Sequence, residues 1–152
     1  MTRGAAWTVH LSVIAAGTTG VVYGWMRYFC EPDPEAFTIQ NHALEDELQA
    51  AHIVLVPLLV FACGLLWRTH VWGRIRANYQ PRRRTGMVLA FALLPMVLSG
   101  YMVQAGASPF WHDLWIWMHG TTSTLWLLTY AVHQLSSPGE NDATPPRFDN
   151  KV

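Results

Sequence analysis

Four long apolar stretches limit the folds open to this chain of 152 residues. They cover about residues 5–29, 50–67, 86–105 and 111–135, and the last is the most polar. A helix of roughly 20 apolar residues crosses the hydrocarbon core of a bilayer, and no stretch alternates with the period of two that is typical of a strand. The sequence therefore predicts an all-α integral membrane protein. We expect a four-helix bundle over residues 1–135 and a flexible cytoplasmic tail over residues 136–152, where Pro and Gly are frequent.

Charged residues lie between the apolar stretches, and neighbouring loops carry opposite signs. Residues 30–49 contain six acidic residues and no Lys or Arg, whereas residues 68–84 contain six Arg and no acid. The positive-inside rule puts the Arg-rich loop in the cytoplasm, which predicts that both termini are cytoplasmic and that the acidic loop faces outward. The first apolar run is too long for the core of a cleaved signal peptide, which favours a retained helix.

Composition excludes several classes of protein. Charged residues make up only 13% of the chain, and ten Lys and Arg balance ten Asp and Glu. A nucleic-acid binder would need a basic excess, so we expect membrane lipid and no nucleic acid among the partners. Two cysteines cannot build a disulfide framework, and Cys30 and Cys63 cannot form the reactive pair of a disulfide-exchange enzyme.

Four of the seven histidines fall at two matching depths. The interval from His119 to His133 is about 40° short of four full helical turns, so the two share one face and lie about 21 Å apart. The first stretch starts on the inner side and the second on the outer side. We therefore expect His10 to meet His133 near the inner surface, and His52 to meet His119 in the outer half.

Two histidine pairs at two levels of a bundle suit two non-covalent haem b groups. Each haem iron takes two axial imidazoles from facing helices, so we predict His10, His52, His119 and His133 as the iron ligands. Zinc would instead require about four N or S ligands gathered at one level. An ionisable or metal-binding side chain inside a membrane is costly, and it therefore indicates a functional site.

Glycines on two of the stretches support the same arrangement. Gly17 and Gly24 follow His10 at steps of seven and share its face, and Gly86 and Gly100 have the same spacing as His119 and His133. A flat porphyrin lies close to a helix only where a side chain is missing. We therefore predict haem contacts at Gly17, Gly24 and Gly100, with close packing of one helix on another as the alternative.

His70 has several possible roles. It follows His52 by five full helical turns, so it would share that helix's face among arginines of the basic loop. It is an alternative inner ligand, a propionate partner or a quinone-site residue. His112, beside Asp113 at the outer rim, is predicted to contact a headgroup or a quinone.

Together these residues resemble the bacterial di-haem, four-helix cytochrome b family. That family includes cytochrome b-561 and the cytochrome b subunits of membrane hydrogenases and formate dehydrogenases. The resemblance covers roughly residues 7–134 and departs from the family at Leu11, where a Trp is common, and at Gly120, where an acid is frequent. It rests on four motifs: Val9-His10-Leu11, Ala51-His52-Ile53, Leu98-Ser99-Gly100-Tyr101, and His119-Gly120 followed on the same stretch by His133.

The resemblance implies electron transfer through two bis-His b haems in the bacterial inner membrane. Quinone would be the substrate, and a periplasmic cytochrome or an oxidoreductase subunit would be the redox partner; the catalytic residues and the direction of electron flow stay open. A stand-alone enzyme of the same fold that oxidises superoxide is a further reading, although the acidic outer face would repel that anion. The alternative from another class is a haem-free four-helix transporter or assembly subunit that uses His for proton relay. That alternative gives no reason for two depth-matched pairs.

Overall fold

A computed structural model describes residues 2–32, 41–105 and 108–136 of the chain. The described residues are almost entirely helical, and no strand occurs among them. This confirms the predicted all-α class. The elements in chain order are α1 (Arg3–Phe29), α2 (Glu45–Leu66), a π-helix η1 (Trp67–Trp72), α3 (Gly73–Arg76), α4 (Arg83–Ala105) and α5 (Pro109–Leu135).

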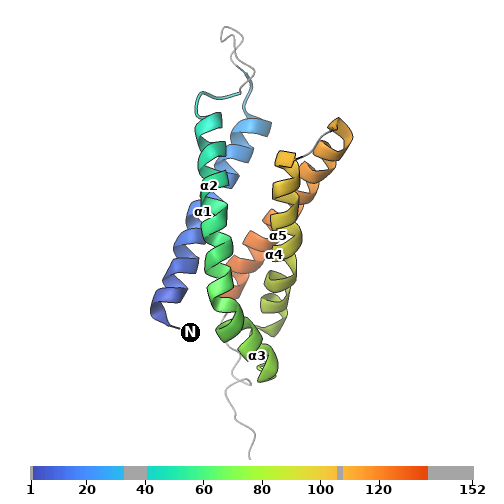
Figure 1. The fold of residues 1–152 in the computed structure, drawn as a ribbon. Coiled ribbons are helices and arrows are strands. Elements are labelled where there is room, and N and C mark those ends of the chain that lie inside the picture. The colour runs from blue at the N-terminus through green and yellow to red at the C-terminus, as the bar shows by residue number, and fades with distance from the viewer. Residues whose placement is uncertain (1, 33–40, 106–107, 137–152) are drawn as a thin grey trace, which may run out of the picture. The chain divides into compact units, whose positions relative to one another are not determined.

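The helices form two compact units, residues 1–73 and 74–152, and each unit is built on one antiparallel helical pair. In the first unit α2 returns along α1, and in the second α5 returns along α4 (Figure 1). Antiparallel packing places residues near the end of the first helix of each pair beside residues near the start of the second. Contacts between histidines and glycines within a pair follow from this register.

Local signals explain where the long helices begin. The Oγ1 atom of Thr2 accepts a hydrogen bond from the backbone N–H of Ala5 and so caps α1. The second helix begins at Glu45, ahead of the apolar stretch that predicted it. Three consecutive acidic residues form its first turn, where the positive end of the helix dipole favours them. Hydropathy alone does not detect such a turn.

A π-helix follows α2 directly. It covers Trp67–Trp72, includes His70, and leads into the short helix α3. A π-turn holds more residues than an α-turn, so the residues after Leu66 rotate less per position than in an α-helix. The expectation that His70 shares the face of His52 assumed an unbroken α-helix between them, and this interval is not wholly α-helical.

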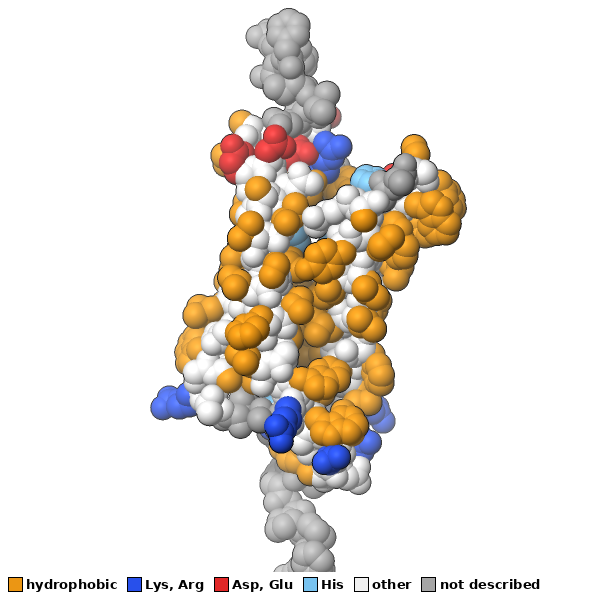
Figure 2. All heavy atoms as spheres, in the orientation of Figure 1, with side chains coloured by type: hydrophobic (Ala, Val, Ile, Leu, Met, Phe, Trp, Pro, Cys, Tyr) orange, Lys and Arg blue, Asp and Glu red, His pale blue; other side chains and the backbone are white. Residues whose placement is uncertain are grey.

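Three helices are long and apolar enough to cross a membrane: α1, α2 and α4. Few of their side chains are buried within the protein, and large apolar side chains such as Phe91 (71% exposed) and Val54 (69% exposed) face outward. Figure 2 shows apolar side chains along the helices and acidic side chains gathered where α2 begins. An apolar exterior of this extent suits lipid rather than water, and it indicates a membrane protein.

The helix α5 is as long as α1, but it is not among these three candidate spans. Its mid-helix hydroxyl groups bond back to the helix itself, as expected for Ser and Thr inside apolar helices. Thr121 Oγ1 donates to the carbonyl of Trp117 at 2.8 Å, and Thr122 Oγ1 donates to the carbonyl of Met118 at 2.7 Å.

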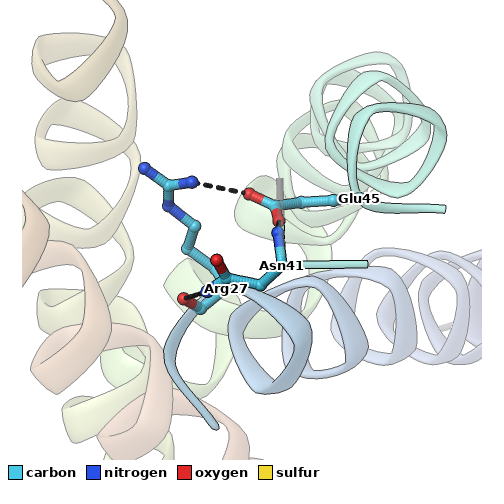
Figure 3. Close-up of polar contacts among 3 residues, drawn as sticks. All are labelled: Arg27, Asn41 and Glu45. Atoms are coloured by element: carbon cyan, nitrogen blue, oxygen red, sulfur yellow. Dashed lines mark hydrogen bonds and ion pairs between the residues drawn. The ribbon is translucent and has the colours of Figure 1, made fainter. Parts of the chain in front are cut away.

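A polar cluster of three residues ties the end of α1 to the start of α2 (Figure 3). Arg27 donates to Glu45 at 3.0 Å, and the backbone N–H of Asn41 donates to the other carboxylate oxygen at 2.9 Å. The side-chain amide of Asn41 in turn donates to the carbonyl of Arg27 at 2.7 Å. Glu45 is only 4% exposed, so its charge needs these partners. The cluster fixes how far α2 is shifted along α1.

Candidate functional site

His52 of α2 packs edge-on against Gly20 of α1. A Cβ atom added at Gly20 would lie 2.7 Å from the Cε1 atom of the ring, so only a glycine leaves room for it. The Nδ1 atom of His52 lies 3.0 Å from the carbonyl oxygen of Ala16 and 3.3 Å from the Oγ1 atom of Thr19. The ring is thus held on α1 by a carbonyl, a hydroxyl and a missing side chain.

His119 of α5 packs against α4 in the same way. A Cβ atom added at Gly100 would lie 2.9 Å from the Cε1 atom of His119. The Nδ1 atom lies 3.0 Å from the carbonyl oxygen of Met96 and 3.5 Å from the Oγ atom of Ser99, which is fully buried. The other ring nitrogen, Nε2, lies 3.5 Å from the Oγ atom of Ser123, at the long limit of a hydrogen bond.

The two histidine niches therefore have one design. Each uses a backbone carbonyl, a hydroxyl three positions later and a glycine in the next position, all on the first helix of a pair. The histidine comes from the second helix of the same pair. Gly20 follows the first residue of α1 by 17 positions, and Gly100 follows the first residue of α4 by 17 positions.

The hydrogen bonds fix the tautomer of both histidines. A carbonyl oxygen can only accept, so Nδ1 must carry the proton and donate it. The adjacent hydroxyls already donate to their own helix, Thr19 to Ala15 at 2.9 Å and Ser99 to Pro95 at 2.7 Å. In each neutral ring Nε2 then keeps its lone pair, which is the form in which imidazole binds a metal.

His133, near the end of α5, has a related niche. Its Nδ1 atom lies 2.8 Å from the Oγ1 atom of Thr85, and Thr85 donates its single hydroxyl proton to the carbonyl of Arg82 at 3.0 Å. The hydroxyl must therefore accept from His133, which again leaves the lone pair on Nε2. The neighbouring Gly86 is less crowded, because an added Cβ atom would lie 3.6 Å from the ring.

The fourth predicted ligand, His10, lies half-buried on α1 and meets the Trp7 ring edge-on, with 6.0 Å between ring centroids. It precedes Gly20, the position that contacts His52, by about 15 Å along the helix. His119 and His133 are about 21 Å apart by the same measure. The spacing along the helix between the two histidine levels is therefore about 6 Å shorter in the first pair than in the second.

The predicted glycine contacts have different surroundings. Gly100 has the His119 ring above it, so an imidazole fills the space that the sequence assigned to a porphyrin. Gly24 has open space where a Cβ atom would be, and Gly17 is half-buried on α1. The spacing between Gly86 and Gly100 matches the spacing between the two histidines that they contact.

Sequence reasoning missed three of the residues that hold the rings: Gly20, its hydroxyl neighbour Thr19, and Thr85. Ser99 was named within a motif, but its contact with His119 was not foreseen. A hydroxyl residue followed by glycine, at a position level with a histidine of the paired helix, is the signal that would have found them.

The remaining histidines lie outside these niches. His70 is half-buried within the π-helix, and its carbonyl accepts from the N–H of Gly73. His112 lies 3.7 Å from the carboxylate of the exposed Asp113 at the start of α5. No group of three or more His, Cys, Asp and Glu side chains suited to a metal forms among the described residues.

This arrangement can present imidazole lone pairs to a metal. Three histidines on helices have their Nδ1 atom held by a hydrogen-bond partner, which is how proteins orient metal-ligating imidazoles. Such donors fit axial ligation of haem iron. Comparison of the chain with protein-family models, curated proteins and solved structures finds no match.

Proposed function

We propose that the chain is a membrane cytochrome b that binds two haem b groups and moves electrons between quinone and a redox partner. His52 and His119 would ligate the outer haem, and His10 and His133 the inner one. Haem, when bound, supplies reversible one-electron chemistry. The chain's own residues hold and orient the ligand rings, bury the porphyrins and tune their potentials through hydrogen bonds.

The single observation that carries this proposal is the anchored Nδ1–H of three of the four histidines. A histidine that passes a proton from one ring nitrogen to the other needs both nitrogens. A ring whose Nδ1 proton is donated to a carbonyl or a hydroxyl is suited to ligation through Nε2 and poorly suited to that kind of relay. The haem-free transporter or assembly subunit is therefore the weaker candidate.

Matching positions of the two carbonyl–hydroxyl–glycine niches support the outer pair. In a bundle with α1 and α4 both starting on the cytoplasmic side, Gly20 and Gly100 would each lie about 26 Å from the helix start. His52 and His119 would then reach one haem from opposite pairs at one depth. The depths of His10 and His133 would then differ by about 6 Å along the helix axes, so the inner pair is less well matched. His70 is therefore the competing inner ligand.

The proposal includes four membrane-spanning helices with both termini in the cytoplasm of a bacterial cell. The fourth span is α5, whose polar hydroxyls are satisfied within the helix and so add little to the cost of insertion. Its histidines face the bundle in this arrangement. The six arginines of residues 68–84 would set this orientation.

The acidic outer loop is the proposed docking surface for a basic periplasmic cytochrome or an oxidoreductase subunit. Glu45 is buried and paired with Arg27, but the other five acidic residues of residues 30–49 would speed association with a positively charged partner. In this proposal the chain would serve as the quinone-reactive subunit of a larger system.

Histidine variants test the ligand assignment. His119→Ala and His52→Ala should each remove the outer haem and spare the inner one, whereas His133→Ala should do the reverse. His112→Ala is the matched control, because it removes a histidine from the same helix outside any niche. Haem content and reduced-minus-oxidised spectra of the purified variants are the measurements. Retention of both haems with unchanged spectra in His119→Ala would exclude the proposed pairing.

A further inference from the structure

A cavity of about 620 Å³ lies at the end of the α4–α5 pair that carries the basic loop. Its walls include the three consecutive arginines at the start of α4, together with Met87 and, from the end of α5, Ser136. All the residues that line it belong to the second unit. It adjoins the His133 niche, because Arg82 and Thr85 belong to both, and none of the three histidines lines it.

Three arginines line this cavity, and the described residues of the second unit place no acid near them in the sequence. Residues 74–105 contain no acid, and the single acid of residues 108–136 is Asp113. Asp113 lies near the start of α5, about 34 Å along the helix from Ser136. The arginines also stand at the positive end of the α4 dipole, where cations are unfavourable. An anion at this place would relieve both effects.

Arg82 gives a second sign of a missing partner. Its Nε atom is buried and has no hydrogen-bond partner within the described part of the chain. A buried polar atom without a partner costs free energy, and in native proteins it calls for a partner of some kind. The backbone of Arg82 adopts a left-handed conformation, with φ of 55°, which is strained for a residue other than glycine.

Apolar surface beside the cavity indicates what kind of anion fits. Arg84, Val88 and Phe91 follow each other at i, i+4 and i+7, so they lie on one face of α4. All three side chains are exposed, and Phe91 is exposed over 71% of its surface. This face is cationic at its end and apolar over the next two turns. A phosphate with acyl chains matches that order of surfaces, whereas free phosphate matches only its first part.

We propose that this cavity binds the headgroup of an anionic phospholipid of the phosphatidylglycerol class, with its phosphate beside Arg82 and its acyl chains along Val88 and Phe91. Basic pockets between membrane helices on the cytoplasmic side are a known place for such headgroups. The proposal requires membrane insertion but no haem, so it stands or fails separately from the proposed electron transfer.

The test is lipid binding to the purified full-length protein in detergent, followed by native mass spectrometry. Dioleoyl phosphatidylglycerol is compared with dioleoyl phosphatidylcholine, with and without competing inorganic phosphate. The wild-type chain should prefer the anionic lipid by about fivefold for each arginine that contacts it. Phosphate alone should compete weakly, because it lacks acyl chains. Equal binding of both lipids would overturn the proposal.

Matched variants locate the site. Arg82→Gln with Arg84→Gln should remove most of the preference, Arg82→Lys should keep part of it, and Arg76→Gln should leave it unchanged because Arg76 does not line the cavity. Circular dichroism and thermal melting check that each variant folds. Equal loss of preference in Arg76→Gln would mean a diffuse field rather than a site.

Two other groups could occupy the cavity, and each would give a result in this test that differs from the one expected for a lipid. If a haem propionate fills the cavity, Arg82→Gln lowers the haem content and leaves the lipid preference as in the wild-type chain. If the acidic residues after Ser136 fill it, the wild-type chain shows no lipid preference, and one appears only in the variant Glu140→Gln with Asp142→Asn. Either result would refute lipid binding at this site.

Discussion

Substituting Gly100 by alanine is the sharpest perturbation of the outer niche. The new Cβ atom would lie 2.9 Å from the Cε1 atom of His119 and 3.1 Å from its Nδ1 atom. The ring must retreat by about half an ångström to reach ordinary contact at 3.4 Å. That movement stretches the 3.0 Å hydrogen bond from Nδ1 to the carbonyl of Met96.

The expected effect is on haem affinity rather than on folding. Alanine is a better helix former than glycine by about 1 kcal/mol, so the backbone of α4 gains stability from the change. Loss of a hydrogen bond that orients a metal ligand lowers metal affinity by about 10- to 100-fold. We therefore expect Gly100→Ala to fold, to keep the inner haem and to lose much of the outer one.

The assay is the pyridine haemochrome count per chain, with haem titration into protein purified with little haem. Gly86→Ala is the matched control, because its Cβ atom would lie at an ordinary 3.6 Å from His133. Gly120→Ala is a second control, because an added Cβ atom there meets nothing within 4 Å. The reasoning is refuted if Gly100→Ala binds two haems with wild-type affinity, or if Gly86→Ala loses as much haem as Gly100→Ala.

Three further predictions concern other parts of the chain. Glu45→Gln should lower the free energy of unfolding by about 1–3 kcal/mol, because it weakens one partner in a buried polar cluster. The control is Glu47→Gln, which changes an exposed side chain and should alter the free energy of unfolding by no more than about 0.5 kcal/mol. Thermal melts in detergent compare the two variants, and equal melting temperatures would contradict the stabilising role of Glu45. Trp126→Phe removes the 3.1 Å hydrogen bond from the indole N–H to the carbonyl of Leu89 and should cost about 1 kcal/mol in the same melts, so an unchanged melting temperature would count against it. His70→Ala should keep two haems per chain, and loss of one would make His70 the inner ligand.

The helices were predictable because their signals are local. An apolar stretch of roughly 20 residues is enough to indicate a span by itself. The helices α1 and α4 begin at Arg3 and Arg83, within one turn of the expected positions. The start of α2 at Glu45 was missed, since its first turn is polar and is stabilised by the helix dipole and by Arg27. The π-helix after Leu66 was also missed, because one altered turn leaves no trace in hydropathy.

The histidine niches were predictable only in part. Spacing along α5 put His119 and His133 on one face, and Gly86 and Gly100 were recognised by their equal spacing. What spacing cannot give is the register between two helices of a pair. That register depends on packing and on contacts such as the Arg27–Glu45 ion pair, and it decides that Gly20, rather than Gly17 or Gly24, contacts His52.

The haem stoichiometry of the purified wild-type protein tests the central claim most directly. The protein is expressed with ample haem supply, purified in detergent, and measured by pyridine haemochrome and by its reduced-minus-oxidised spectrum. Our account predicts two b haems per chain with six-coordinate, low-spin bands. A protein that folds, melts cooperatively and carries no haem would contradict it.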